Sequence, residues 1–147
     1  SITGSTNIAD GNWHHIVVTS TGETDGYAIY VDKVAESLTG TNDGDWFADT
    51  TNRKNFTIGA LQRTDNQYFW IGGLDELAIY SKVLSTAEIA ALYGSGTPQT
   101  TIDANNISNL VGYWRMEEGS GTSVVDSSTS SNAGTLTNME DADWTAH

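Results

Sequence analysis

The stretch from Trp70 to Gly94 constrains the fold more than any other part of the chain. It begins with the strand pattern Trp-Ile-Gly-Gly-Leu-Asp-Glu-Leu-Ala-Ile-Tyr and continues into Ser85, with Glu88 three residues later. Ser and Glu at this spacing form a capping box, which predicts a helix at about 85–93, and Gly94 marks its end. A helix of about two and a half turns is not stable alone in water. It must therefore pack against a sheet that the rest of the chain supplies.

Strand patterns dominate the remaining sequence, so we predict an all-β fold. Val31-Asp32-Lys33-Val34 predicts a tight hairpin turn, although Lys33 resists the positive φ that such a turn requires. Gly72-Gly73 predicts a bulge or a close backbone approach. The expected strands, rich in β-branched and aromatic residues, lie at residues 13–19, 27–32, 34–38, 56–59, 68–80, 110–116, 123–125 and 134–138.

The charge of the chain excludes several classes of partner. Six basic against nineteen acidic side chains give a formal net charge of −13, so neither nucleic acid nor an anionic membrane surface is an expected partner. The acidity favours either solubility and protection of exposed strands or the binding of a divalent cation by a few carboxylates. The chain has no cysteine, which excludes disulfides and thiolate sites.

The composition and the first residue of the chain indicate where the protein is located relative to the cell. No apolar run approaches the length of a transmembrane helix, so membrane insertion is not expected. The sequence begins at Ser1 without a signal-peptide pattern, which indicates a processed chain or an excised fragment. Thr, Ser, Asn and Gly are plentiful while Lys and Pro are scarce. We therefore expect an extracellular, cell-surface or virion-exterior protein.

Three stretches together resemble one known family. The stretches are Asp10-Gly-Asn-Trp-His-His-Ile-Val-Val-Thr19 with Tyr27-Ala-Ile-Tyr-Val-Asp32, residues 72–93, and residues 110–136. They are similar to the laminin-G-like branch of the concanavalin A-like lectin/glucanase superfamily. The resemblance implies a jelly-roll sandwich of two antiparallel sheets, with function in the loops and on the concave face.

The order of these stretches is reversed relative to that family, where the strand-and-helix closes a domain and the stretch at 110–136 opens one. We therefore divide the chain into the C-terminal part of a sandwich at 1–94, a linker at 95–109, and opening strands at 110–147. These opening strands can complete the same sandwich by permutation, complete that of a neighbouring subunit, or begin a second repeat. The family's middle strands are not recognisable in the sequence, which favours truncation or assembly over a permutation.

The resemblance also implies a cation site. In the family, the Asp of the closing strand often lies beside the loop that follows the opening strands, which places Asp75 with Asp126 and Asn132. Calcium takes six to eight oxygen ligands, which this loop can supply from carboxylate, amide, hydroxyl and carbonyl groups. The loop lacks the family's glycines, because Thr129, Ser130 and Ser131 stand in their place. The alternative is that Asp126 caps a turn and Asp75 accepts backbone hydrogen bonds. Calcium is the only cofactor that the sequence suggests.

Aromatic residues in or beside loops are candidates for ligand binding. Sugars stack on aromatic faces, and Trp46, Phe47, Tyr68 and Trp70 can supply such a platform, with Phe69 beside them. The alternative for each is packing within the sandwich, and for Trp13, Trp114 and Tyr80 we expect packing.

Catalysis is not expected. His14 and His15 point to opposite faces if they lie in a strand, so they cannot grip one ion together. Glucanases of the same fold carry their two acids at alternate positions of one strand, whereas Asp75 and Glu76 are adjacent, as are Glu117 and Glu118. A glycoside hydrolase is thus a distant third possibility.

Two functional hypotheses remain. The first is a non-catalytic carbohydrate-binding or adhesion module of a larger extracellular or surface protein, aided by calcium, whose partner is a glycan or another surface ligand. The second is a structural or assembly domain of a bacterial surface or phage virion protein, which contacts copies of itself or neighbouring domains.

Overall fold

The computed structural model describes residues 2–41, 43–45, 56–62, 66–94 and 104–144. The strands are β1 (Ile2–Thr3), β2 (Ile16–Ser20), β3 (Tyr27–Val31), β4 (Val34–Ala35), β5 (Thr39–Gly40), β6 (Leu61–Gln62), β7 (Asn66–Gln67), β8 (Leu77–Tyr80), β9 (Leu110–Trp114), β10 (Ser123–Val124) and β11 (Gly134–Thr135). The helices are α1 (Thr86–Tyr93) and the short 3-10 helices η1 (Ala104–Asn106) and η2 (Asp141–Asp143).

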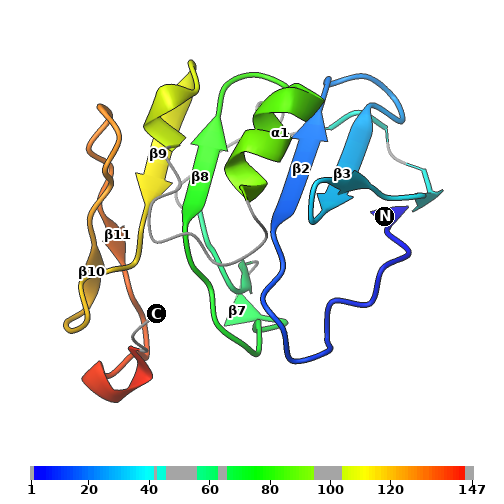
Figure 1. Ribbon diagram of the computed structural model, residues 1–147. Helices are drawn as coiled ribbons and strands as arrows, with labels where there is room; N and C mark the ends of the chain where they lie inside the picture. The colour runs from blue at the N-terminus through cyan, green and yellow to red at the C-terminus, as the bar shows by residue number, and fades with distance from the viewer. Residues whose placement is uncertain (1, 42, 46–55, 63–65, 95–103, 145–147) are drawn as a thin grey trace.

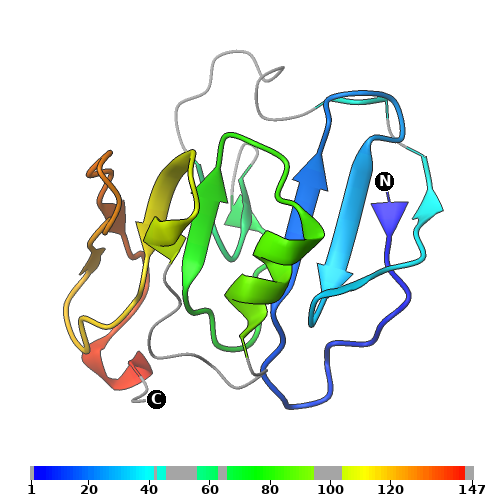
Figure 2. The same ribbon diagram turned by 45° about the horizontal axis from the view of Figure 1, so that its top comes forward.

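Antiparallel pairing organises these strands into several small sheets. β2, β3 and β4 form one sheet, β8 pairs with β9, and the pairs β1–β5, β6–β7 and β10–β11 lie around them. In both views α1 lies across β2 and β8, so one helix covers both sheets from the same side (Figures 1 and 2). The predicted fold class is confirmed: the chain is mostly β, with antiparallel sheets and one short α-helix. Over the described ranges the sheets do not close into a complete sandwich.

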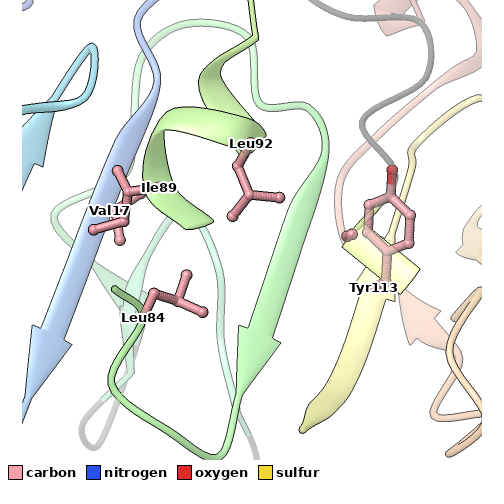
Figure 3. Close-up of a cluster of buried hydrophobic side chains, with 6 residues drawn as sticks. Val17, Leu84, Ile89, Leu92 and Tyr113 are labelled. Carbon is pink, nitrogen blue, oxygen red and sulfur yellow. The ribbon is translucent and has the colours of Figure 1, made fainter. Parts of the chain in front are cut away.

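The core lies between α1 and the two sheets. Figure 3 shows the side chains that form it, which are Val17 of β2, Leu84, Ile89 and Leu92 in and before α1, and Tyr113 of β9, joined by Ala104. Ile89 and Ala104 are completely buried. The Tyr80 hydroxyl donates to the Ala104 carbonyl at 3.1 Å, which ties β8 to the start of η1. The helix is thus held by apolar burial, as its short length requires.

β9 joins the front of the chain by pairing with β8. Leu77 faces Trp114, Ala78 faces Tyr113 and Ile79 faces Gly112, with an irregularity after Ile79. Beyond the strands, the Ser81 backbone N–H donates to the Asn109 carbonyl at 2.9 Å. The structure thus shows β9 paired with β8 of the same chain. The division at 94 and 109, and the choice between this sandwich, a neighbouring subunit's and a second repeat, stay predictions.

Two local signals in the sequence are confirmed. Asp32 and Lys33 both adopt positive φ, of 49° and 65°, and Val31 pairs with Val34 across the turn. The Lys33 ammonium lies 4.9 Å from the centre of the Tyr93 ring, a cation–π contact between the turn and α1.

The capping box of α1 is the second confirmed signal. Ser85 Oγ accepts the Glu88 backbone N–H at 3.3 Å, and Glu88 Oε2 accepts the Ser85 backbone N–H at 2.9 Å. Gly94 ends the helix with a φ of 59°. No helix among the described residues has the length and apolar character needed to cross a membrane.

Several predicted strands are wrong or shorter than expected. Residues 56–59 and 68–76 are not strands, because positive φ at Gly59, Tyr68, Gly72 and Glu76 interrupts the extended backbone. Residues 13–15 precede β2 instead of belonging to it. The expected strand at 34–38 contracts to β4.

Truncating Ile89 tests whether α1 is held by the core. We expect Ile89→Ala to lower the free energy of unfolding by about 2–5 kcal/mol, because it removes buried methyl groups and leaves a cavity. Val83→Ala is the control, since Val83 is exposed and should change stability by no more than about 0.5 kcal/mol. Urea denaturation measures both. Equal effects of the two substitutions would contradict the packing described here.

Candidate functional site

Trp70 donates two hydrogen bonds, one from its backbone and one from its indole. Its backbone N–H donates to the Gly59 carbonyl at 2.7 Å, and its indole Nε1–H donates to the Gly73 carbonyl at 3.2 Å. The residue nevertheless remains 49% exposed. A large aromatic side chain that is hydrogen-bonded and also open to solvent is a usual feature of a ligand-contacting tryptophan.

Trp13 lies against the same glycine pair. A Cβ placed on Gly73 would come within 2.5 Å of Trp13 Cη2, so only glycine allows the ring to rest there. At Gly72-Gly73 the sequence predicts a bulge or a close backbone approach, and the structure instead has a side-chain ring against the glycine. The predicted packing role of Trp13 is met on one side only, because 46% of the residue is exposed. We call Trp13, Trp70, Gly72 and Gly73 the Trp platform.

Further apolar residues between positions 56 and 74, near Trp70 in the sequence, are also exposed. They are Phe56, Ile58, Tyr68, Phe69, Ile71 and Leu74. Of the predicted ligand residues, Tyr68 and Trp70 are therefore exposed, whereas Trp46 and Phe47 lie outside the described residues. The contact of Trp13 with Gly73 was not predicted, since nothing in the sequence indicates it.

Asp126 is a buried carboxylate that organises the loop after β10. Its Oδ1 accepts the backbone N–H groups of Tyr113 and Ser128, and its Oδ2 accepts that of Asn132, each at 2.8 Å. Burial raises the pKa of Asp126, but these donors outweigh it and hold the pKa below its usual range. The loop is thus fixed to β9 through backbone amides.

Asp75 and Asp126 belong to segments on the two edges of β9. Trp114 of β9 pairs with Leu77 of β8 on one edge and forms a bridge with Asp126 on the other, and Asp75 lies two residues before Leu77. The Asp75 carboxylate accepts the backbone N–H of Glu76 at 3.0 Å. The described residues contain no group of three or more His, Asp or Glu side chains that could hold a metal. A calcium site at Asp75, Asp126 and Asn132 stays a prediction.

Glu76 forms a half-buried polar cluster that the sequence did not indicate. Its Oε2 accepts the Tyr113 hydroxyl, and its Oε1 lies 3.7 Å from Arg115 Nε. Arg115 also donates to Glu117 at 2.6 Å. Burial raises the pKa of Glu76, and burial together with the Glu76 carboxylate raises the pKa of Tyr113. The cluster joins the start of β8 to β9.

The two histidines contact different groups. His14 Nδ1 lies 2.8 Å from Asp32 Oδ2, and Nε2 lies 3.1 Å from Asp10 Oδ1. Because carboxylates only accept hydrogen bonds, both contacts require a doubly protonated imidazolium. The His15 ring instead packs near the Tyr93 ring, with centroids 6.1 Å apart. His14 therefore fastens the Asp10 turn to the β3–β4 hairpin.

Comparison with known proteins places the chain in a family. A laminin G-type family model, described as the concanavalin A-like lectin/glucanases superfamily, matches residues 1–90. The chain belongs to this family. Neither the curated proteins nor the solved structures contain a match. Membership of this family supports a general role of the laminin G-like domain as a lectin-like or adhesion module.

The matched region contains most of the features described above. It includes the β2–β3 hairpin, the Trp platform, β8 and the first turn of α1, but ends before β9. The resemblance of residues 110–136 to the family's opening strands therefore rests on the motif and on the pairing of β9 with β8.

The His14 contacts predict a pH effect of known sign. Hydrogen bonds to Asp32 and Asp10 raise the pKa of His14 above its usual 6.5. Their contribution to stability is therefore complete below pH 6.5 and is lost as the pH rises through the higher folded-state pKa. Burial lowers the pKa of His15, so its effect has the opposite sign.

NMR titration of each imidazole separates the two effects. We expect the His14 midpoint above 6.5 and the His15 midpoint below it, and a fall of the His14 midpoint in Asp32→Asn. Asp43→Asn, an exposed acid elsewhere in the chain, is the control. A His14 midpoint that does not move in Asp32→Asn contradicts the assigned contact.

Proposed function

We propose that this laminin G-like domain is a non-catalytic carbohydrate-binding or adhesion module of a larger extracellular or surface protein. The observation that carries the proposal is Trp70, whose backbone N–H and indole N–H each donate one hydrogen bond while the residue stays half exposed. Tyr68 beside it is also exposed. Aromatic faces of this kind stack on the apolar faces of sugars.

The indole hydrogen bond adds to this support. A side chain that is already hydrogen-bonded in the free protein loses less conformational entropy on binding, so more of the contact free energy appears as affinity. In Trp70 this bond runs from Nε1 to the Gly73 carbonyl.

The carboxylates near β8 support a non-catalytic role. A glycosidase needs two acids facing one bond. Asp75 and Glu76 are adjacent, and Glu76 is engaged by Tyr113 and Arg115. Its contacts join two strands, which is a structural task.

Calcium belongs to the proposal as an aid to binding, through the Asp126–Asn132 loop and Asp75. What supports it is the family resemblance of that loop together with its oxygen-rich composition. An ion there has to be held by carbonyl and hydroxyl oxygens in addition to Asp126, because both carboxylate oxygens already accept backbone N–H groups.

A structural role in a bacterial surface or virion assembly is the second candidate. One observation favours it: Ile16 and Val18 of β2 are apolar and exposed, on the face opposite the buried Val17. Apolar residues in such a position are typical of a surface that contacts another protein.

A glycan array tests the proposed function. We expect the domain to bind at least one glycan, and Trp70→Ala to weaken binding about tenfold or more, equivalent to about 1.4 kcal/mol. Trp144→Ala is the matched control, because Trp144 lies in the C-terminal segment and its indole donates to the Gly121 carbonyl.

The array is run with calcium and with EDTA. Lower signals in EDTA are expected, and equal signals contradict the calcium part alone. A complete lack of glycan signal contradicts carbohydrate binding and favours the assembly role.

A further inference from the structure

Two tryptophans from distant parts of the chain flank one glycine pair. Trp13 precedes β2, whereas Trp70 lies before β8. The benzene edge of Trp13 rests on Gly73, and the Trp70 indole lies beside Gly72, where an added Cβ would be 3.2 Å from Nε1. The Trp70 indole also donates to the Gly73 carbonyl at 3.2 Å, so both rings contact the same residue.

We propose that the Trp platform binds an extended, uncharged glycan chain, with Trp13 and Trp70 contacting neighbouring sugar units. This inference rests on the proposed carbohydrate-binding function and adds to it the class of ligand and a second contact residue. Trp13 is a ligand-binding residue in addition to a packing residue.

The pairing of the rings favours a chain over a single sugar. One indole face covers about one sugar ring, so two adjacent indoles offer contact to more than one unit. Both tryptophans are about half exposed, so each can contact a ligand. A ligand with only one sugar ring can use only one of the two faces.

The charge of the domain favours an uncharged glycan. The net charge is −13, and Asp10 and Asp75 lie within three residues of Trp13 and Gly73. Sulfated or uronic-acid glycans would meet like charge there, which slows association and weakens binding. Neutral sugars avoid this repulsion and present hydroxyl groups that can donate to carboxylates.

Gly73 is the positioning residue of the platform. Its missing side chain provides the space in which the Trp13 ring lies, and any Cβ there would be 2.5–2.9 Å from two ring atoms. Gly73→Ala therefore displaces Trp13 from the platform while Trp13 itself remains in the chain. This substitution tests the effect of moving the Trp13 ring, whereas Trp13→Ala tests the effect of removing it.

The test uses isothermal titration of the whole chain with defined oligosaccharides. The probes are the disaccharides and hexasaccharides of β-1,4-glucose, β-1,3-glucose, β-1,4-mannose, β-1,4-xylose and α-1,4-glucose, with a heparin hexasaccharide as the charged comparison. The variants are Trp13→Ala, Trp13→Phe, Trp70→Ala and Gly73→Ala, with Trp144→Ala as control. A thermal melt of each variant identifies any that fail to fold, and Trp13→Phe then replaces Trp13→Ala.

We expect at least one neutral hexasaccharide to bind about tenfold or more tightly than its disaccharide, and more tightly than the heparin hexasaccharide. Trp13→Ala, Trp70→Ala and Gly73→Ala should each remove about tenfold in affinity, Trp13→Phe less, and Trp144→Ala nothing. Losses at Trp13 and Trp70 that are not additive would support contact with one continuous ligand.

Three results overturn the inference. Unchanged hexasaccharide affinity in the Trp13 and Gly73 variants removes Trp13 from the site and leaves the proposed function intact. Binding of the heparin probe alone overturns the uncharged class. If no neutral probe binds although the array finds another glycan, the inference is also overturned. An array without any signal overturns the proposed function as well.

Discussion

The pairing of β9 with β8 is the interaction on which the rest of the structure depends. β9 supplies Tyr113, whose ring completes the core under α1 and whose hydroxyl satisfies Glu76. The opposite edge of β9 holds the Asp126 loop through the Tyr113 backbone amide. Without this strand, α1 would lose part of its apolar support, and Glu76 would be a half-buried carboxylate without its hydroxyl donor, which is costly.

The same pairing fixes the position of the candidate site. The segment that carries Trp70 and Gly73 leads directly into β8, so the position of its last residues is set by β8. On the other side, the His14 contacts and the β2–β3 pairing hold the segment that carries Trp13. The Trp platform thus forms where two well-anchored elements bring their preceding loops together. A rigid support for exposed aromatic rings is what binding without large entropy loss requires.

Features that depend on neighbouring residues could be predicted from the sequence, and features that depend on tertiary contact could not. The capping box at Ser85 and the hairpin at Asp32-Lys33 are set by local geometry. The stretch at 68–76 has strand composition, yet positive φ at Tyr68 and Glu76 interrupts it, and non-glycine residues give no local sign of this conformation. The contact of Trp13 with Gly73 joins distant segments. The sequence therefore indicates that a glycine is required at position 73, but not which residue packs against it.

A disulfide between residues 81 and 109 tests the central claim most directly, namely that the back of the chain folds onto the front of the same molecule. The chain has no cysteine, and the Ser81 N–H donates to the Asn109 carbonyl at 2.9 Å at the end of the β8–β9 pair. In the double variant Ser81→Cys, Asn109→Cys, mild oxidation at low protein concentration should give a disulfide-linked monomer by non-reducing mass analysis. Disulfide-linked dimers would contradict the account.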